Sequence, residues 1–201
     1  MSWLLALHSS SEVLGVGVMR LTAPSSGRSA GFPLGRALAN DLLGCVEQLL
    51  PAADWPQLQR LIVATGPGGF TGTRLTVVLA RTLAQQLAIP LHGVSSFLLV
   101  AARHGISEPT WVVQELPRRG QVAGLYAPNA NALGGVMELE LPRLFATGTD
   151  LPPGPRLVAA PQMPADVDTL LAMGLEAERH QLPGPWEPVL PVYPTSPVGS
   201  V

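Results

Sequence analysis

The sequence contains no lysine, and all twelve of its cationic residues are arginines. The chain therefore has no lysine for Schiff-base or general-base chemistry, and it cannot form a Walker A loop, which needs a lysine before its Ser/Thr. Charged residues make up 13% of the chain, and the net charge is −2. With no basic cluster, a stand-alone nucleic-acid binder is disfavoured. So low a charge density favours a partner that covers part of the apolar surface.

Residues that could carry catalysis or hold a metal are also scarce. The one cysteine, Cys45, stands in an apolar helical pattern, where a buried and inert thiol is expected. The four histidines form no ligand pattern with each other or with carboxylates, and no Gly-x-Ser-x-Gly elbow is present. Asp166 and Asp168 are expected to start a helix rather than to bind Mg²⁺. The sequence thus lacks the parts of a self-sufficient enzyme.

No targeting or membrane segment is expected from the sequence. The apolar run from Trp3 to Leu7 is too short for a signal peptide and follows no cationic region. No apolar stretch approaches the length that spans a bilayer. We therefore expect a cytoplasmic protein that does not contact a membrane.

Hydrophobic periodicity predicts strands and helices that alternate through the first half of the chain. Strands are predicted at 3–8, 13–21, 61–65 and 90–94, helices at 34–50, 72–88 and 95–104, and a loop or frayed edge strand at 22–33. The second half predicts strands at 111–116, 122–126, 136–141 and 156–160, a weak helix at 165–173, and an extended, proline-rich tail from Pro183 that lies on another part of the fold. This order indicates an α/β fold with mixed sheets. We expect an N-terminal lobe over 1–104 and a smaller C-terminal lobe over 105–201.

One glycine-rich stretch, Gly66 to Arg74, joins a predicted strand to a predicted helix. Its glycines allow a sharp turn and a close approach to another group, and Thr71 is expected to cap the helix. Free amide groups at a helix N-terminus can bind an anion. A tight turn whose glycines serve packing is an equally good interpretation. If a nucleotide binds, we expect it at the residues Gly68, Gly69, Thr71 and Arg74.

The same stretch, Ala-Thr-Gly-Pro-Gly-Gly-Phe-Thr-Gly-Thr-Arg, resembles the signature of the TsaB (YeaZ) family. So do the first strand, Leu-Ala-Leu-His-Ser-Ser, and the segment Gly-Val-Ser-Ser one helix after the signature. Arg119 to Val122 is similar to the family's Arg-x-Gly-Glu-Val/Ile segment, and Pro191-Val192-Tyr193 is similar to its closing Pro-x-Tyr. The resemblance is strong over residues 3–97 and thin beyond them.

The resemblance implies an actin/Hsp70-like (ASKHA) fold of two lobes, the second of them reduced. It also implies a non-catalytic subunit that supports a TsaD-like transferase in making threonylcarbamoyladenosine beside the tRNA anticodon. A TsaE-like ATPase would bind to these two subunits, and tRNA would contact this chain only as part of the complex. No cofactor of its own is expected, and ATP or ADP would bind, if at all, at the interface with the partner.

In that family, TsaB pairs with TsaD helix against helix through the first lobe. The helices predicted at 34–50 and 72–88 are apolar on two sides, so one side can pack on the sheet and the other on a partner. The alternative is that both sides are buried within the chain's own lobes. A homodimer is expected when the partner is absent. The residues predicted at this interface are Leu34, Leu38, Ala39, Leu42, Leu43, Val46, Val77, Ala80, Arg81 and Ala84.

Two departures from the family pattern bear on catalysis. His8 stands where the family has an Asp in its first strand, and the segment Gln114 to Pro117 replaces Ile-Asp-Ala-Arg. Both changes weaken the alternative of a free-standing ASKHA ATPase or kinase. A peptidase is disfavoured as well, because the sequence supplies neither a nucleophile with a base nor a set of metal ligands.

Overall fold

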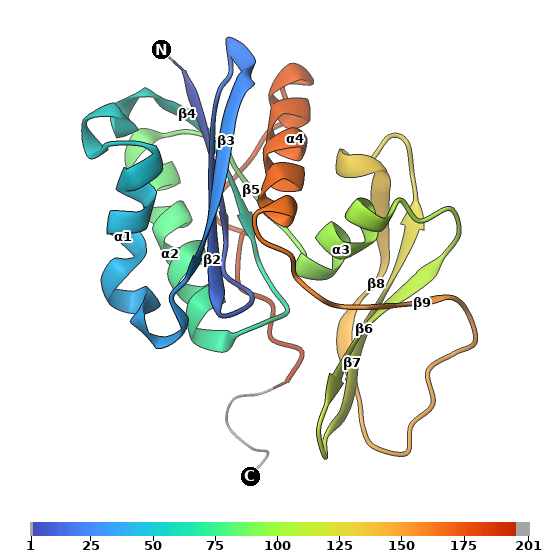
Figure 1. Ribbon diagram of the computed structural model, residues 1–201. Coiled ribbons are helices and arrows are strands. Elements are labelled where there is room, and N and C mark those ends of the chain that lie inside the picture. The colour runs from blue at the N-terminus through green and yellow to red at the C-terminus, as the bar shows by residue number, and fades with distance from the viewer. Residues whose placement is uncertain (1, 196–201) are drawn as a thin grey trace.

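A computed structural model describes residues 2–195 and shows two α/β lobes, each built on its own sheet (Figure 1). In the first lobe the strand order is β3-β2-β1-β4-β5. β1 pairs antiparallel with β2 and parallel with β4. The strands of this sheet are β1 (Trp3–His8), β2 (Val13–Arg20), β3 (Ala23–Pro33), β4 (Leu58–Ala64) and β5 (Leu91–Val94). The opening hairpin is therefore confirmed, and the segment predicted as a loop or edge strand is the edge strand β3.

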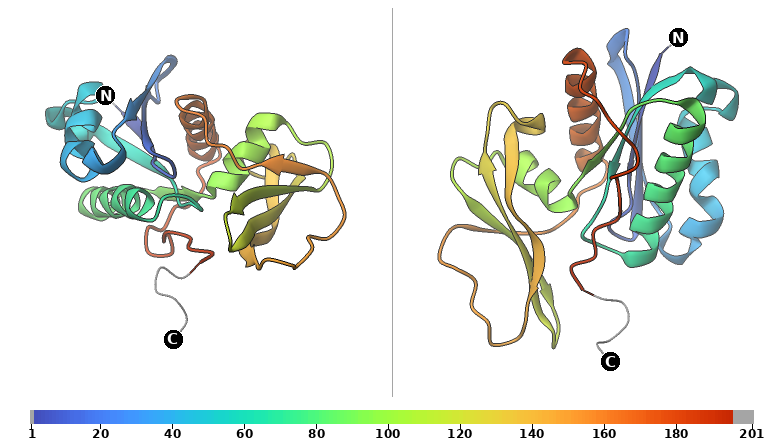
Figure 2. Two further views of the ribbon diagram at one scale, coloured as in Figure 1. Left: turned by 60° about the horizontal axis from the view of Figure 1, so that its bottom comes forward. Right: turned by 180° about the vertical axis from the view of Figure 1, so that it is seen from behind.

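Helices cover both faces of this first sheet. α1 (Leu38–Leu49) and α2 (Phe70–Leu87) lie on one face, and α4 (Ala165–Arg179) lies on the other (Figure 2). Alternate side chains of β1 point to opposite faces, so Leu5 and Leu7 join the cluster under α1 and α2, whereas Leu4 and Ala6 join the cluster under α4. Burial on both faces explains why β1 is apolar at almost every position.

The second lobe has a four-stranded sheet in the order β8-β7-β6-β9. α3 (Ser96–His104) packs on one of its faces. The strands are β6 (Thr110–Leu116), β7 (Gly120–Pro128), β8 (Val136–Phe145) and β9 (Arg156–Val158). Three short 3₁₀ turns complete the elements, at Gly35–Ala37, Ala52–Gln57 and Leu133–Gly135.

The chain passes into the second sheet after α3 and returns to the first lobe with α4, which packs on β1, β2 and β4. Asp166 and Asp168 lie in the first turn of this helix, as predicted, but the helix continues to Arg179. The lobe boundary after residue 104 stays a prediction.

Two predicted helix starts are corrected. The helix expected from residue 34 begins with a 3₁₀ turn and becomes α-helical at Leu38. The helix expected from residue 72 begins at Phe70, with Gly69 at the N-cap position and no side chain capping it. Thr71 thus lies inside the first turn and is not the cap, because the backbone turns into the helix two residues earlier than the sequence suggests.

The tail after α4 packs on the first lobe, as predicted for the stretch from Pro183. The amide of Val192 donates to the carbonyl of Thr65 at 2.7 Å. Arg81 of α2 donates to three tail carbonyls, those of Trp186, Glu187 and Val189. The last part of the predicted tail, 196–201, lies outside the described residues. Within residues 2–195, no helix combines the length and the apolar character needed to span a membrane.

Candidate functional site

The glycine-rich loop packs directly on the turn between β1 and β2. The amide of Gly69 donates to the carbonyl oxygen of Ser10 at 2.8 Å. A Cβ atom at Gly68 would lie 2.2 Å from that oxygen, and one at Gly72 would lie 2.6 Å from the carbonyl oxygen of Ser9. These contacts require glycine, since any side chain would push the loop away from the turn. The packing interpretation of the glycines is therefore supported. The Gly69 amide, which could have bound an anion, donates its hydrogen bond to Ser10 instead.

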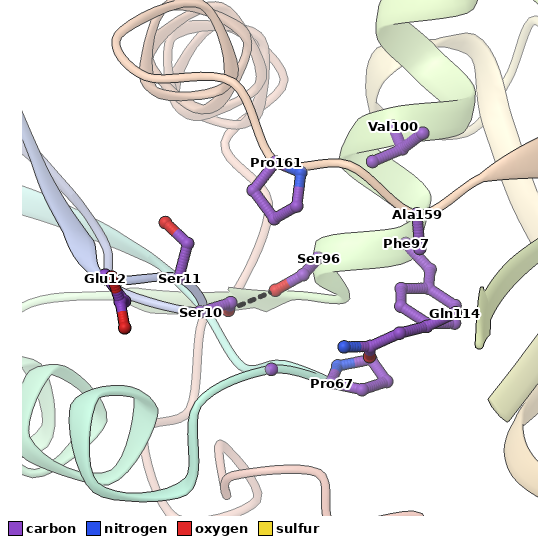
Figure 3. A pocket seen from close by; sticks show the side chains of 11 residues that line it. Ser10, Ser11, Glu12, Pro67, Ser96, Phe97, Val100, Gln114, Ala159 and Pro161 are labelled. Atoms are coloured by element: carbon purple, nitrogen blue, oxygen red, sulfur yellow. Dashed lines mark hydrogen bonds between the residues drawn. The ribbon is translucent and has the colours of Figure 1, made fainter. Parts of the chain in front are cut away.

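Serine hydroxyls tie three elements together at this point. Ser9 Oγ lies 2.7 Å from Thr76 Oγ1 of α2, and Ser10 Oγ lies 2.5 Å from Ser96 Oγ at the start of α3 (Figure 3). The amide of Ser96 also donates to the carbonyl of Gly66 at 2.7 Å. The Ser-Ser pair after the first strand and the Ser-Ser pair after β5 thus meet across the lobes.

A cleft of about 240 Å³ lies beside this junction, between the two lobes. Its lining residues are Ser10, Ser11, Glu12, Pro67, Gly68, Ser96, Phe97, Val100, Gln114, Ala159 and Pro161 (Figure 3). Glu12 is the one charged side chain among them. No cationic side chain in the described part of the chain lines this cleft, and a carboxylate repels phosphate, so the cleft is poorly suited to a nucleotide.

A second cavity of about 440 Å³ lies on the other side of the β1–β2 turn. It is lined by Gly69 and Thr71 and by two side chains of opposite charge, Arg36 and Glu12. The four residues predicted to contact a nucleotide are thus divided: Gly68 lines the interlobe cleft, Gly69 and Thr71 line the second cavity, and Arg74 lines neither. The structure does not gather them into one site, and nucleotide contact by them stays a prediction.

His8 occupies the place of the family's aspartate and is completely buried at the end of β1. Burial lowers the pKa of His8 to about 4, against a smaller opposing influence of the Asp166 carboxylate. The neutral ring accepts a hydrogen bond at Nδ1 from the amide of Ser10, so Nε2 carries the proton. Within residues 2–195, no group of three or more His, Cys, Asp or Glu side chains is arranged to hold a metal ion.

An ion pair that no sequence pattern indicates joins α3 to α4. Arg103 Nε lies 2.7 Å from Asp166 Oδ1, and the buried carboxylate also accepts from the amide of Gln162 at 2.6 Å. A similar link holds the other end of α4, where buried Arg60 of β4 contacts Glu178 and His92. Burial, and then the charge of Arg60, lower the pKa of His92 to about 4. Both clusters join residues far apart in the sequence, which periodicity alone cannot pair.

The residues predicted at the partner interface separate into core and surface. Leu38, Leu42, Val46, Val77, Ala80 and Ala84 lie in the core under α1 and α2, so they face the chain's own sheet and cannot meet a partner. Leu34 and Arg81 are half-buried, whereas Ala39 and Leu43 are exposed. This corrects the predicted surface, because the stripes assigned to a partner are the ones that pack on the sheet.

What these helices offer to a partner is their outward side, which we call the outer helical face. The outer helical face is formed by exposed residues that are four positions apart on each helix. α1 and α2 lie side by side, and this face points away from the sheet (Figure 2). Its residues are Ala39, Leu43 and Glu47 of α1 and Arg74, Val78 and Thr82 of α2. Leu43 and Val78 are 50% and 52% exposed, so each presents a large apolar side chain to solvent.

Part of the chain is similar in sequence to known proteins. The family described as "TsaD: tRNA N6-adenosine threonylcarbamoyltransferase" matches residues 34–120. The tRNA threonylcarbamoyladenosine biosynthesis protein TsaB of Bacillus subtilis (strain 168) is 47% identical over 88 residues, which are 40% of this chain and 37% of that protein. Over these residues the chain is similar to TsaB and to the TsaD-type family. The aligned part spans well under half of the Bacillus TsaB.

Solved structures of YeaZ proteins share the fold over nearly the whole chain. YeaZ from Pseudomonas aeruginosa is 23% identical with a TM-score of 0.69, and the match covers 96% of this chain and all of that one. A protein described as uncharacterized, with similarity to peptidase YeaZ from Pseudomonas aeruginosa, is also 23% identical, with a TM-score of 0.73 over 97% of this chain and all of that one. The predicted two-lobed ASKHA-type fold is thereby confirmed.

Proposed function

We propose that this chain is a TsaB-type, non-catalytic subunit that supports a TsaD-type threonylcarbamoyl transferase in making threonylcarbamoyladenosine next to the tRNA anticodon. The similarity to Bacillus TsaB supports the pathway. The observation that carries the non-catalytic role is the packing of the glycine loop, whose Gly69 amide is used by Ser10 and whose Gly68 touches the same turn. His8 in the first strand is buried and neutral, which also supports a non-catalytic role.

The outer helical face is the surface proposed to meet the TsaD-type subunit. Leu43 and Val78 are half exposed there, and apolar side chains in the middle of a helical surface are typical of interface centres. In the absence of the partner, the same face would pair with a second copy of the chain. A TsaE-type ATPase and tRNA would then join through the complex, with any ATP or ADP bound at its interface.

Co-elution of purified proteins tests this proposal. The chain is mixed with the TsaD-type protein of its own organism and separated by size-exclusion chromatography with light scattering. We expect a complex that contains both proteins, and we expect the chain alone to form no threonylcarbamoyladenosine. Separate elution of the two proteins at micromolar concentration, or modification of tRNA by the chain alone, would refute the proposal.

The competing proposal of a free-standing ATPase is less well supported, because the one charged side chain that lines the interlobe cleft is Glu12. Calorimetry with ATP and Mg²⁺ decides between the two. Turnover by the isolated chain would favour the ATPase.

A further inference from the structure

A separate cavity of about 340 Å³ lies where β5, α3, β8 and α4 come together. It shares no lining residue with the interlobe cleft. Most of its wall is apolar, and a volume of this size is within the range of small-molecule sites. The lining residues that matter here are Ser95, Leu98, Leu133, Val136, Glu138 and Met173.

A chain of hydrogen bonds holds the only charged group of this wall in place. The Tyr126 hydroxyl, completely buried, donates to Glu138 Oε2 at 2.9 Å. Since that hydroxyl has one proton, Ser95 Oγ donates to it across 3.0 Å. Ser95 Oγ in turn accepts from the amide of Phe97 at the start of α3. The carboxylate is thus fixed by a relay of hydrogen bonds that runs from α3 to β8.

Glu138 has the features of a receptor for a cation. Among the described residues it forms no ion pair, and its second oxygen, Oε1, accepts no hydrogen bond. The neighbouring carboxylate on the same side of β8, Glu140, pairs with Arg143 instead. Burial raises the pKa of Glu138; a cation at Oε1 would compensate for this loss of solvation.

We propose that this cavity binds a small aliphatic ammonium compound, with the ammonium group on Glu138 Oε1 and the carbon chain between Leu98, Val136 and Met173. The apolar wall accounts for the aliphatic part and the fixed carboxylate for the charge. This site goes beyond the proposed role as a subunit, because it requires no transferase. Its ligand would bridge the lobes, since Met173 belongs to α4 on the first sheet and Glu138 to β8 of the second sheet.

The test uses hexylammonium and the neutral hexan-1-ol as matched probes, with binding to the full chain followed by amide chemical shifts. We expect hexylammonium to shift the amides of Ser95 and Glu138 in a saturable way. Glu138→Gln keeps an oxygen that can accept from Tyr126 but removes the negative charge. Hexylammonium should therefore bind this variant about tenfold or more weakly, because a hydrogen bond to a charged group contributes about 1.5–3 kcal/mol. Hexan-1-ol should bind equally to both proteins.

Two further variants complete the design. Glu140→Gln removes a carboxylate that does not line the cavity and should leave both probes unaffected. Leu133→Trp fills the cavity and should block both. Equal hexylammonium affinity for wild type and Glu138→Gln, or no saturable shift at millimolar hexylammonium, would overturn the proposal and show that the relay only joins α3 to the second sheet. Either result leaves the proposed function untouched, since TsaD binding is not part of the measurement.

Discussion

The amide nitrogen of Gly69 lies 2.8 Å from the carbonyl oxygen of Ser10, so the glycine loop is bonded to the β1–β2 turn. The glycine-rich stretch that resembles the TsaB signature thus forms a packing joint with this turn. It brings β1, α2 and α3 together at the serine hydroxyls and sets the position of α2. The outer helical face that we propose for partner binding depends on that position.

The joint predicts that Gly68→Ala destabilises the protein. Its Cβ would meet the backbone of Ser10 at 2.2 Å, and backbone cannot move as a flexible side chain can. We expect the free energy of unfolding to fall by about 1–3 kcal/mol, as measured by urea denaturation. The matched control is Gly44→Ala in α1, where nothing lies within 4 Å of the new Cβ; there the free energy of unfolding should rise by about 0.5–1 kcal/mol. Equal effects of the two substitutions would contradict the packing interpretation.

The burial of His8 predicts a loss of stability in mild acid. The pKa of His8 is about 4 in the folded chain, below its ordinary value of 6.5. Between these two values the unfolded chain binds a proton that the folded chain does not. The free energy of unfolding therefore decreases as the pH falls from 6.5 toward 4, by up to about 1.4 kcal/mol per pH unit. His92 acts in the same direction, since its pKa is lowered as well.

Denaturation at a series of pH values checks this dependence. His8→Asn should make it shallower and leave the contribution of His92, whereas His104→Gln, at an exposed position, should leave it unchanged. An NMR titration of the His8 ring gives an independent answer should the Asn variant fail to fold. A His8 pKa near 6.5 in the folded protein would refute the prediction.

The contacts of Arg81 predict that it anchors the tail. Its guanidinium donates to three tail carbonyls and lies over the ring of Trp186. Each hydrogen bond from a charged group contributes about 1.5–3 kcal/mol. In Arg81→Leu we therefore expect the amide of Val192 to exchange with deuterium at least about tenfold faster, since each factor of ten corresponds to about 1.4 kcal/mol.

Arg36→Ala provides the control for the tail, because Arg36 is an exposed residue of the 3₁₀ turn before α1. It should leave the exchange of Val192 at the wild-type rate. Unchanged exchange in Arg81→Leu would mean that the backbone contact of Val192 with Thr65 holds the tail by itself.

The corrected interface predicts different effects for surface and core substitutions. Val78→Glu and Leu43→Glu place a charge on the outer helical face and should abolish association with the TsaD-type subunit while changing the free energy of unfolding by only about 0.5 kcal/mol. Leu38→Glu places a charge in the core and should unfold the chain. Calorimetric titration measures the loss of association, and thermal denaturation measures the loss of stability. Full affinity in both surface variants would refute this interface.

Much of the fold could be predicted from the sequence because it is local. The apolar runs and the helical periodicity located most of the elements of the first lobe, and the string from Gly66 to Arg74 indicated the resemblance to TsaB. The sides of α1 and α2 could not be assigned, because the helices carry apolar residues on more than one side. Only the packed sheet shows that Leu38 is in the core and Leu43 on the surface.

The long-range contacts of the site could not be predicted at all. Arg103 and Asp166 are in different elements, and they meet only because α4 returns to the first lobe. The relay from Ser95 through Tyr126 to Glu138 likewise joins α3 to two strands of the second sheet. No period or motif links such residues, so three-dimensional packing was needed to find them.

The central claim is that the chain supports modification of tRNA by a partner without catalysing it. The most direct measurement is the threonylcarbamoyladenosine content of tRNA from cells of its organism that lack this chain and carry either the wild type or Val78→Glu on a plasmid. The account predicts that the wild type restores the modification and that Val78→Glu, present at the same level and folded, does not. Failure of the wild type to restore it, or full restoration by Val78→Glu together with Leu43→Glu, would contradict the account.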